Sequence, residues 1–284
     1  MVELLSLMGF NRSQLNLTVP LITLLSDFGL KDPYVAEMKA VAFRISPDAR
    51  LVDITHSIDK FNIRMGAFIL ASATRYFPNG TIHVAVVDPG VGTKRRALIV
   101  QTRRYFYVGP DNGLLMLAAE KDGISHVYTV VNPEFMLPKV SSTFHGRDVF
   151  APVAAHLANG NSPKKFGPEV KDYCRPRFTK PVLQDDGKLG GEVLHIDDFG
   201  NLITNIASAD LAKAGVKATK PLNIRLKSIL LHLSFCGTYG EKPPKSTLAL
   251  IGSHDFLEIA VNQGNASKKL KVKVGDAVII SQAR

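Results

Sequence analysis

The chain has 284 residues, enough for one large domain or two domains of ordinary size. Hydrophobic residues make up 45% and charged residues 21%, so a packed core is expected, and no apolar run reaches the roughly 18 residues that a membrane span needs. The N-terminal stretch MVELLSLMGF is too short and lacks the basic start of a signal peptide, which predicts a cytoplasmic protein without a membrane anchor. Cys174 and Cys236 lie far apart in the chain and predict neither a disulfide framework nor a zinc motif.

The net charge of +10 suggests nucleic acid as the first class of partner to consider. The cations are spread along the chain, however, with small clusters at Lys94–Arg96, Arg103–Arg104 and Lys268–Lys273. No RNA-motif aromatic signature accompanies them, and the chain has no tryptophan. Specific nucleic-acid binding is therefore not expected, and solubility or a thermophilic lifestyle accounts for the charge.

Residues 1–19 carry little regular pattern, and we treat them as an N-terminal extension. A short apolar strand at Leu21–Leu25 follows, and a helix at Tyr34–Ile45 begins with a proline in its first turn. Asp27 and Asp32 bracket this strand-to-helix turn, where a carboxylate could accept two hydrogen bonds from a ribose diol. The alternative for Asp32 is an ordinary helix cap.

The next strand is expected at Leu51–Ile54 and the next helix at about Ile63 to Tyr76, with apolar positions at helical spacing. Phe61 stands in the approach to that helix. An aromatic at such a place packs into the core or offers a stacking surface for a flat ligand.

The stretch IHVAVVDPGVGTKRR predicts a buried strand at Ile82–Val87 that delivers Asp88 to its carboxyl end. A tight glycine turn and the cations Lys94–Arg96 come next. A carboxylate at a strand end, beside a glycine turn and a guanidinium, is typical of the sites of open α/β sheets. An Asp-Pro-Gly turn with a solvated basic run is the alternative.

His145 stands at the entrance of an alanine-rich helix expected at Val149–Leu157, with Gly146 beside it. The glycine leaves room for a close approach to the backbone, and the helix N-terminus favours an anion. A packed or capping histidine is the alternative. Three short strands precede this segment, at Ala97–Thr102, Tyr105–Val108 and Val127–Val131.

After about residue 160 the composition shifts to a Lys-, Pro- and Gly-rich stretch that indicates a surface linker, and beyond it the helical patterns largely vanish. Six or seven short strands with turn signals suggest a small β-barrel or sandwich. The expected strands are Gly191–Asp197, Asn201–Ile206, Ser228–Ser234, Thr247–Ile251, Phe256–Val261, Leu270–Val274 and Ala277–Ser281.

Several common catalytic motifs do not occur in the sequence. It contains no Walker loop, no GxGxxG, no HExxH, no GxSxG and no paired-cysteine site. Eight histidines are present, but none pair at helical spacing or within an HxH. We therefore expect no metal site, since its ligands would have to be assembled from scattered positions.

Four segments together resemble one known family. They are residues 26–29 with Asp32, residues 87–93 with the arginines that follow, residues 143–148, and residues 196–205. In this order they resemble the S-adenosyl-L-methionine hydrolases, or hydroxide adenosyltransferases, which are relatives of the fluorinases and chlorinases. The resemblance runs from about residue 21 to the C-terminus.

The resemblance implies an α/β N-terminal domain, with a mixed sheet flanked by helices, and a C-terminal β-barrel domain. On this basis the chain divides into an extension at 1–19, the α/β domain at 20–165, a linker at 166–189 and the barrel at 190–284. It also implies a homotrimer in which the substrate lies between the N-terminal domain of one subunit and the C-terminal domain of the next.

The family implies hydrolysis of S-adenosyl-L-methionine to adenosine and methionine, with Asp88, Arg95 and His145 as catalytic residues. The halogenases carry other residues at the matching aspartate and histidine positions, so this trio favours water over halide. The implied substrate-binding residues are Asp27, Asp32, Phe61, Phe144, Gly146, Asp197, Phe199, Asn201, Ser253, Glu258, Val261 and Asn262.

This chemistry makes sense of the residue types. The substrate is a sulfonium, so its leaving group departs as a neutral thioether and needs no general acid. Water is a weak nucleophile, and Asp88 and His145 would take or share its proton while Arg95 keeps Asp88 ionised. No metal or cofactor is required. The alternatives are a halide-dependent halogenase of the same fold and a non-catalytic nucleotide- or RNA-binding protein.

Overall fold

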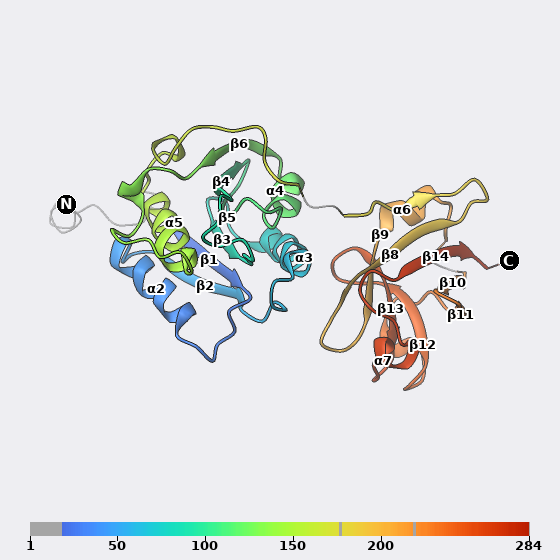
Figure 1. The fold of residues 1–284 in the computed structure, drawn as a ribbon. Helices are drawn as coiled ribbons and strands as arrows, with labels where there is room; N and C mark the ends of the chain where they lie inside the picture. Colours follow the sequence, from blue (N-terminus) through green and yellow to red (C-terminus); the bar gives the residue numbers. More distant parts are fainter. Residues whose placement is uncertain (1–18, 176–177, 218–219, 284) are drawn as a thin grey trace, which may run out of the picture. The chain divides into compact units, whose positions relative to one another are not determined.

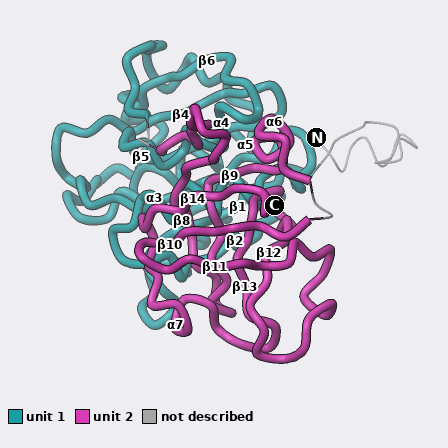
Figure 2. Tube along the Cα trace, turned by 90° about the vertical axis from the view of Figure 1, so that its right-hand side faces the viewer, with its two compact units in different colours: residues 1–176 teal, residues 177–284 magenta. Residues whose placement is uncertain are grey.

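The computed structural model describes residues 19–175, 178–217 and 220–283. The chain forms two compact units, residues 1–176 and residues 177–284 (Figure 2). Apart from residue 19, the expected N-terminal extension lies outside the described residues, and the expected domain limits stay a prediction. None of the helices that the structure describes has the length and apolar character needed to span a bilayer.

The first unit is built on a six-stranded mixed sheet with the order β2-β1-β3-β5-β4-β6 (Figure 1). Strands β2, β1, β3 and β5 run parallel, whereas β4 is antiparallel to both of its neighbours. This confirms the predicted α/β fold with a mixed sheet. The strands are β1 (Leu21–Ser26), β2 (Arg50–Thr55), β3 (Ile82–Val86), β4 (Ala97–Thr102), β5 (Phe106–Pro110) and β6 (Ile124–Thr129).

Helices cover both faces of this sheet (Figure 1). Alternate residues of β3 point to opposite faces, and Ile82, Val84 and Val86 pack in the main core with residues of α2 and α5. Helices α3 and α4 pack together on the other face. The bounds are α2 (Tyr34–Ile45), α3 (Ile63–Ala73), α4 (Met116–Asp122) and α5 (Ala151–Ala158), with short 3-10 turns at Thr74–Tyr76, Pro133–Phe135 and Pro163–Lys165.

The parallel strands bring polar residues to one edge of the sheet. Strands β2, β1 and β3 are neighbours, and the residues that follow them include His56, Asp27 and Asp88. Because parallel strands end at the same edge, these three residues leave the sheet on the same side.

The start of the expected linker belongs to the first unit in the structure. Phe166 is fully buried in the main core. The chain then runs along β6, where the amide of Val170 donates to the carbonyl of Val127 and the amide of Thr129 donates to that of Pro168. The composition of this stretch indicates a surface linker, but the burial of the Phe166 ring holds its start against the first unit.

The second unit is an antiparallel, nearly closed barrel-like sheet with the order β11-β10-β14-β8-β9-β13-β12, and β7 pairs with β8. A bridge between Phe235 and Ala249 brings β12 towards the segment that follows β11. This confirms the predicted C-terminal β-barrel. The strands are β7 (Val182–Leu183), β8 (Leu189–Ile196), β9 (Leu202–Ala207), β10 (Leu222–Leu226), β11 (Ile229–Leu233), β12 (Thr247–Ile251), β13 (Phe256–Val261) and β14 (Ala277–Gln282).

Two elements of this unit differ from the prediction. The prediction of a strand at Leu270–Val274 is wrong, because helix α7 (Ala266–Leu270) includes the first residue of that range. The side chain of Asn265 caps this helix by accepting from the amide of Lys268 at 2.7 Å, and this local capping outweighs the alternating pattern that follows. Strand β10 was not predicted, although its residues alternate between core and surface. Helix α6 (Ser208–Lys213) and a 3-10 turn at Tyr239–Glu241 complete the unit.

His83 is a fully buried polar residue on β3, on the face opposite Val84. Its Nδ1 lies 2.7 Å from the hydroxyl of Thr23 on β1, and the rings of Phe77, Tyr105 and Tyr107 pack around it. Burial lowers the pKa of His83 to about 3. The imidazole is therefore neutral in the folded protein at any pH near neutrality.

We expect this histidine to make the fold sensitive to acid. The unfolded chain takes up a proton near pH 6.5 and the folded chain only near pH 3, so the free energy of unfolding falls as the pH drops between these values. The loss begins only below about pH 6.5 and amounts to about 1.4 kcal/mol per pH unit, so the free energy of unfolding falls by roughly 2 kcal/mol between pH 8 and pH 5. Urea unfolding across this range should show the loss, and His83→Phe should flatten the profile. A variant whose stability changes with pH as steeply as the wild type contradicts the assignment.

Candidate active site

The loop after β3 holds Asp88 in place through its own turn. The side-chain amide of Asn112 donates to the carbonyl of Val87 at 2.8 Å, and the backbone amide of Val91 donates to the carbonyl of Asp88. Gly92 has φ +75°, and a Cβ at this position would lie 2.2 Å from the backbone oxygen of Ser142. Only glycine permits this approach, which sets the Asp88 loop against the segment leading to His145.

Arg95 binds the carboxylate of Asp88 with two of its nitrogens. Its Nε donates to Oδ2 at 2.9 Å and to Oδ1 at 3.1 Å, and its Nη2 donates to Oδ2 at 2.6 Å. The side chains are 11% and 5% exposed, so the pair is largely removed from solvent. Such a bidentate contact fixes the plane of the carboxylate as well as its position.

The same guanidinium contacts His145, fifty positions further along the chain. Nη2 of Arg95 donates to Nδ1 of His145 at 2.7 Å, so a neutral imidazole carries its proton on Nε2. Burial and the charge of Arg95 lower the pKa of His145, against the opposing effects of Asp88 and Asp148 and of a backbone hydrogen bond to Ser141. The structure thus brings the three predicted catalytic residues together.

A π-helical turn at Gly146–Phe150 directly follows His145 and leads into α5. The sequence predicted that this helix begins at Val149. In the structure the helical segment begins earlier, at Gly146, with the π-helical turn that the sequence did not predict. Asp148 is completely buried in this turn, where it accepts from the amide of Ser141 at 2.8 Å and from Nε of Arg147 at 2.7 Å. Arg147 also donates to Glu37 on α2 at 2.8 Å, which ties the His145 segment to that helix.

Asp27 follows β1 and is buried, with one carboxylate oxygen committed to the protein. Its Oδ2 accepts the amide hydrogen of Phe61 at 2.9 Å, and Nζ of Lys60 donates to its backbone carbonyl. Phe61 has φ +66°, a strained conformation for an aromatic residue, and the residue is 69% exposed. Asp32 is exposed on the loop before α2, whose N-cap is Pro33, so the alternative of an Asp32 helix cap is wrong.

Phe144 packs in an aromatic cluster beside the same loop. Its ring centroid lies 5.5 Å from that of Phe28 and 5.1 Å from that of Tyr34, and the guanidinium of Arg147 lies over it. A Cβ on Gly146 would come within about 3.2 Å of Met38, Phe144 and Phe28. The space at Gly146 is therefore filled by these side chains, and its predicted role toward substrate stays a prediction.

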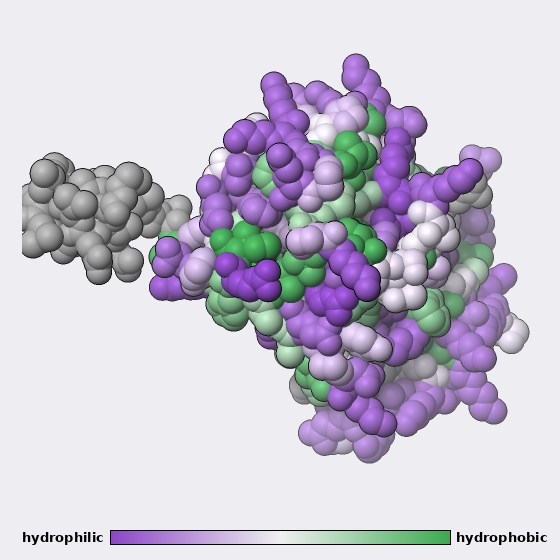
Figure 3. Space-filling view, turned by 60° about the vertical axis from the view of Figure 1, so that its left-hand side comes forward, coloured by the Kyte–Doolittle hydropathy of each residue, from purple (hydrophilic) through white to green (hydrophobic). Residues whose placement is uncertain are grey.

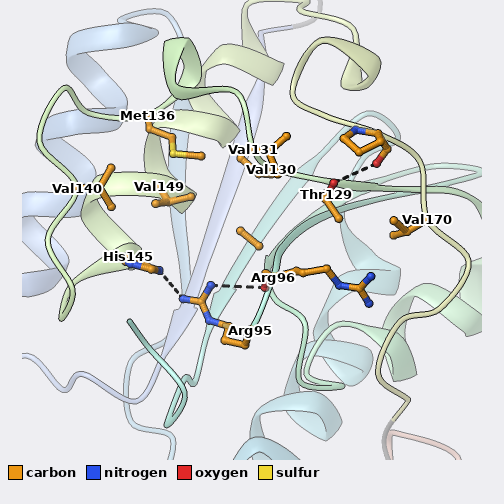
Figure 4. A pocket seen from close by; sticks show the side chains of 12 residues that line it. Arg95, Arg96, Thr129, Val130, Val131, Met136, Val140, His145, Val149 and Val170 are labelled. Carbon is orange, nitrogen blue, oxygen red and sulfur yellow. Dashed lines mark hydrogen bonds between the residues drawn. The ribbon is translucent and has the colours of Figure 1, made fainter. Parts of the chain in front are cut away.

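A pocket of about 480 Å³ opens next to Arg95 and His145. Figure 4 shows Met136, Val140 and Val149 gathered on one side of the contact between His145 and Arg95. None of the predicted substrate-binding residues lines this pocket. Its walls are mainly apolar, and Arg95 and His145 are among the few polar side chains that line it.

The candidate residues of the second unit form a separate group. Asp197 accepts the backbone amide of Asn201 at 2.8 Å and its side-chain amide at 2.9 Å, closing the turn between β8 and β9. Gly200 has φ +85°, and a Cβ there would overlap the side chain of Asn265. Phe199 is 77% exposed at the tip of this turn.

Glu258 lies buried on β13 and accepts a hydrogen bond of 2.5 Å from the hydroxyl of Tyr239. Burial raises the pKa of Glu258, the hydrogen bond from Tyr239 opposes this, and the charge of Asp197 raises it further. Tyr239 was missed by the sequence analysis, because nothing in its turn-rich segment marks it as the partner of a distant acid. Val261 is buried at the end of β13, Asn262 donates to the carbonyl of Lys242, and Ser253 is exposed.

We expect the pKa of His145 to respond in opposite directions to changes in its two neighbours. Arg95→Met removes the charge that lowers it, so the pKa should rise, whereas Asp88→Asn removes a charge that raises it, so the pKa should fall. An NMR titration of the His145 ring in the two variants and the wild type measures both shifts. Shifts of the same sign would contradict the described arrangement.

Comparisons with known proteins cover nearly all of the described chain. A family model described as the SAM hydroxide adenosyltransferase N-terminal domain matches residues 22–167, and the corresponding C-terminal domain matches residues 191–279. An (R)-S-adenosyl-L-methionine hydrolase of Thermus thermophilus is 40% identical, over 88% of this chain and 95% of that protein. A fluorinase of Nocardia brasiliensis is 30% identical, over 91% of this chain and 96% of that protein.

A solved structure of similar fold is that of an uncharacterized conserved protein from Thermotoga maritima. It superposes with a TM-score of 0.87 at 39% sequence identity, and the match covers 91% of this chain and 99% of that one. Both family models, the similar sequences and the similar fold agree with the resemblance carried by the four sequence segments. The chain therefore belongs to the SAM hydroxide adenosyltransferase family.

Proposed function

We propose that the protein is a hydrolase that splits S-adenosyl-L-methionine into adenosine and L-methionine. The observation that carries this proposal is the single guanidinium of Arg95 in contact with both Asp88 and His145. Relatives at 36 to 40% identity are named (R)-S-adenosyl-L-methionine hydrolase, whereas the fluorinases are more distant at 28 to 30%.

The reaction is a displacement at C5′ of the ribose. A water oxygen forms a bond to C5′ as the bond from C5′ to sulfur breaks, and the electron pair of that bond leaves with the sulfur. The sulfonium becomes a neutral thioether, so departure needs no proton. The attacking water must lose one, and a group placed to accept it lowers the barrier.

Asp88 is the better candidate for this acceptor in the described arrangement. Nδ1 of His145 already accepts from Arg95 and Nε2 carries the ring proton, so the imidazole has no free lone pair. The carboxylate of Asp88 retains lone pairs beyond those that Arg95 occupies. His145 then orients the guanidinium, and Arg95 fixes the plane of the Asp88 carboxylate and aims it at the water.

Two groups of residues are available to hold the substrate. Asp27 keeps one carboxylate oxygen beyond its bond to Phe61, which suits the hydroxyls of a ribose. In the second unit, Asp197 at the turn between β8 and β9 is an acid of the kind that a cationic ammonium or sulfonium requires. Local carboxylates of this kind offset the overall charge of +10, which by itself repels a cation.

We further propose that the active form is a homotrimer in which each site combines the first unit of one subunit with the second unit of the next. Each unit carries a prepared group of polar residues and an exposed aromatic ring, Phe61 in one and Phe199 in the other. Apolar residues also gather in patches on one face of the molecule (Figure 3). Exposed apolar surface of this kind is typical of interaction sites. A cytoplasmic location stays a prediction.

We expect the purified protein to form labelled adenosine when it is incubated with S-adenosylmethionine in 18O-labelled water. Mass spectrometry of the nucleoside gives the answer, with the two sulfonium epimers supplied separately because the relatives are named for the (R) form. A 5′-chlorinated nucleoside formed only with added chloride would instead identify a halogenase. Unchanged substrate at several temperatures would overturn the hydrolase proposal.

Asp88→Asn and His145→Ala should each lower kcat by about 100- to 10,000-fold with little change in KM, because Asp88 accepts the proton of the attacking water, His145 orients the Arg95 that holds Asp88, and neither residue binds the substrate. Steady-state adenosine formation measures both constants. His126→Ala is the matched control, since this imidazole pairs with Glu169 and is about half exposed. Full activity in either site variant would refute the assigned roles.

A mixture of two inactive variants tests the shared site. Asp88→Asn removes a group of the first unit and Asp197→Ala one of the second. If the site joins neighbouring subunits, random mixed trimers should regain about a quarter of the wild-type activity, since both residues are intact at one site in four. Co-expression or joint refolding prepares the mixture, and light scattering gives its mass. No recovery in trimers that have exchanged subunits would place the site within one chain.

A further inference from the structure

A buried histidine contacts the residue that precedes the predicted ribose-binding acid. His56 follows β2, its side chain is 2% exposed, and its Nδ1 lies 2.7 Å from the hydroxyl of Ser26. Ser26 is the last residue of β1 and the neighbour of Asp27. The histidine therefore reaches across from one parallel strand to the end of the next.

This contact continues to the surface through two charged groups. Nε2 of His56 lies 3.1 Å from Oδ1 of Asp53, and the other oxygen of Asp53 accepts from Nζ of Lys39 at 2.6 Å. Burial alone would raise the pKa of Asp53, but the bonds with Lys39 and His56 outweigh it and hold that pKa below its ordinary value. The acid is thus ionised and favours the imidazole tautomer with its proton on Nε2, leaving Nδ1 to accept from Ser26.

The backbone at and after His56 is joined to the Asp27 turn, since the amide of Ile58 also donates to the carbonyl of Ser26. The amide of Gly29 donates to the carbonyl of His56 at 2.8 Å, and the hydroxyl of Ser26 accepts from the amide of Phe28 at 3.2 Å. Asp27 itself accepts from the amide of Phe61. The turn after β1 therefore takes its shape from the segment after β2, and His56 is a buried side chain that links the two, in addition to the exposed Lys60.

A serine, a histidine and an aspartate in contact also resemble a hydrolytic triad. The geometry does not support a nucleophilic role, because Ser26 is fully buried and its oxygen already binds the amide of Phe28. A nucleophile must face a substrate. The arrangement instead suits a structural role. The ion pair of Asp53 and Lys39 lies towards the solvent, and the contact between His56 and Ser26 is buried.

We propose that His56 is a positioning residue, which acts through Ser26 to hold the carboxylate of Asp27 and the amide of Phe61 in the geometry that binds the substrate ribose. This inference rests on the proposed function for the identity of the ligand. The claim that the hydrogen bond between His56 and Ser26 keeps Asp27 and Phe61 together does not depend on which ligand is bound.

The test compares three variants with the wild type. His56→Phe keeps a ring but removes both nitrogens, whereas His56→Asn places an amide oxygen where Nδ1 was and can still accept from Ser26. His83→Phe is the matched control, because His83 makes the same 2.7 Å contact with a hydroxyl of β1, that of Thr23, at the other end of the strand. A loss due only to a buried histidine would appear in both phenylalanine variants.

We expect His56→Phe to raise KM for S-adenosylmethionine roughly tenfold or more, the loss that goes with one hydrogen bond to a charged group, with kcat at saturation nearly retained. His56→Asn should restore KM to within about threefold of the wild type, and His83→Phe should leave KM unchanged. Equal KM values in the two phenylalanine variants, or no rescue by asparagine, would overturn the inference.

Hydrogen exchange separates this inference from the function on which it rests. The amide of Phe61 should exchange faster in His56→Phe than in the wild type or in His83→Phe, since its acceptor Asp27 is then loosened. A wild-type protein without turnover would refute the proposed function, and the exchange rates would still decide the positioning role. Unchanged exchange of Phe61 in His56→Phe would refute the positioning role even in an active enzyme.

Discussion

The candidate active site depends on one guanidinium. Arg95 is the common partner of an acid that follows a central strand and of an imidazole at the start of a distant helix, and the contacts are 2.6 Å and 2.7 Å long. Loss of one partner from a buried ion pair leaves an uncompensated charge, which costs about 3 to 5 kcal/mol. The Asp88 loop and the His145 segment are therefore held in one arrangement because each needs Arg95.

Two supports flank this trio, and they share a design. On the His145 side, the buried Asp148 is held by Arg147, which reaches Glu37 on α2. On the Asp27 side, the buried His56 is held by Asp53, which reaches Lys39 on the same helix. In both cases a partly exposed ion pair involves a residue of α2, and it holds a buried residue, Asp148 or His56, on its inner side. Helix α2 thus connects the surroundings of the predicted ribose site with those of the predicted catalytic residues.

Much of this could be predicted from residues that are close in sequence. The strand ending at Asp88, the turn after it and the helix at Tyr34–Ile45 are local patterns, and the structure has them at or within a residue of the predicted bounds. Asp88 and Arg95 were already candidates on these patterns, because a strand end, a glycine turn and a cation lie in one short stretch. His145 had only a glycine and a helix start to mark it, and the resemblance to a family supplied its role.

The remaining features depend on contacts between distant segments, which no local pattern reveals. The approach of Gly92 to Ser142 and the bond from Tyr239 to Glu258 join residues that only the fold brings together. The same holds for Phe166, whose basic and proline-containing surroundings suggest surface although the ring lies in the core. The error at Leu270–Val274 has a local cause, since the Asn265 cap starts a helix within an alternating run.

The π-helical turn at Gly146–Phe150 has a consequence for how this segment can vary among relatives. A π turn is an α-helix with one extra residue in a single turn, and each residue of an α-helix rotates the chain by about 100°. Deletion of one residue here would yield a regular helix and preserve the packing of α5, yet it would swing the imidazole of His145 away from Arg95. The π-helical turn thus rotates the chain between α5 and His145, so that α5 packs in the core as a regular helix while the His145 side chain points to Arg95.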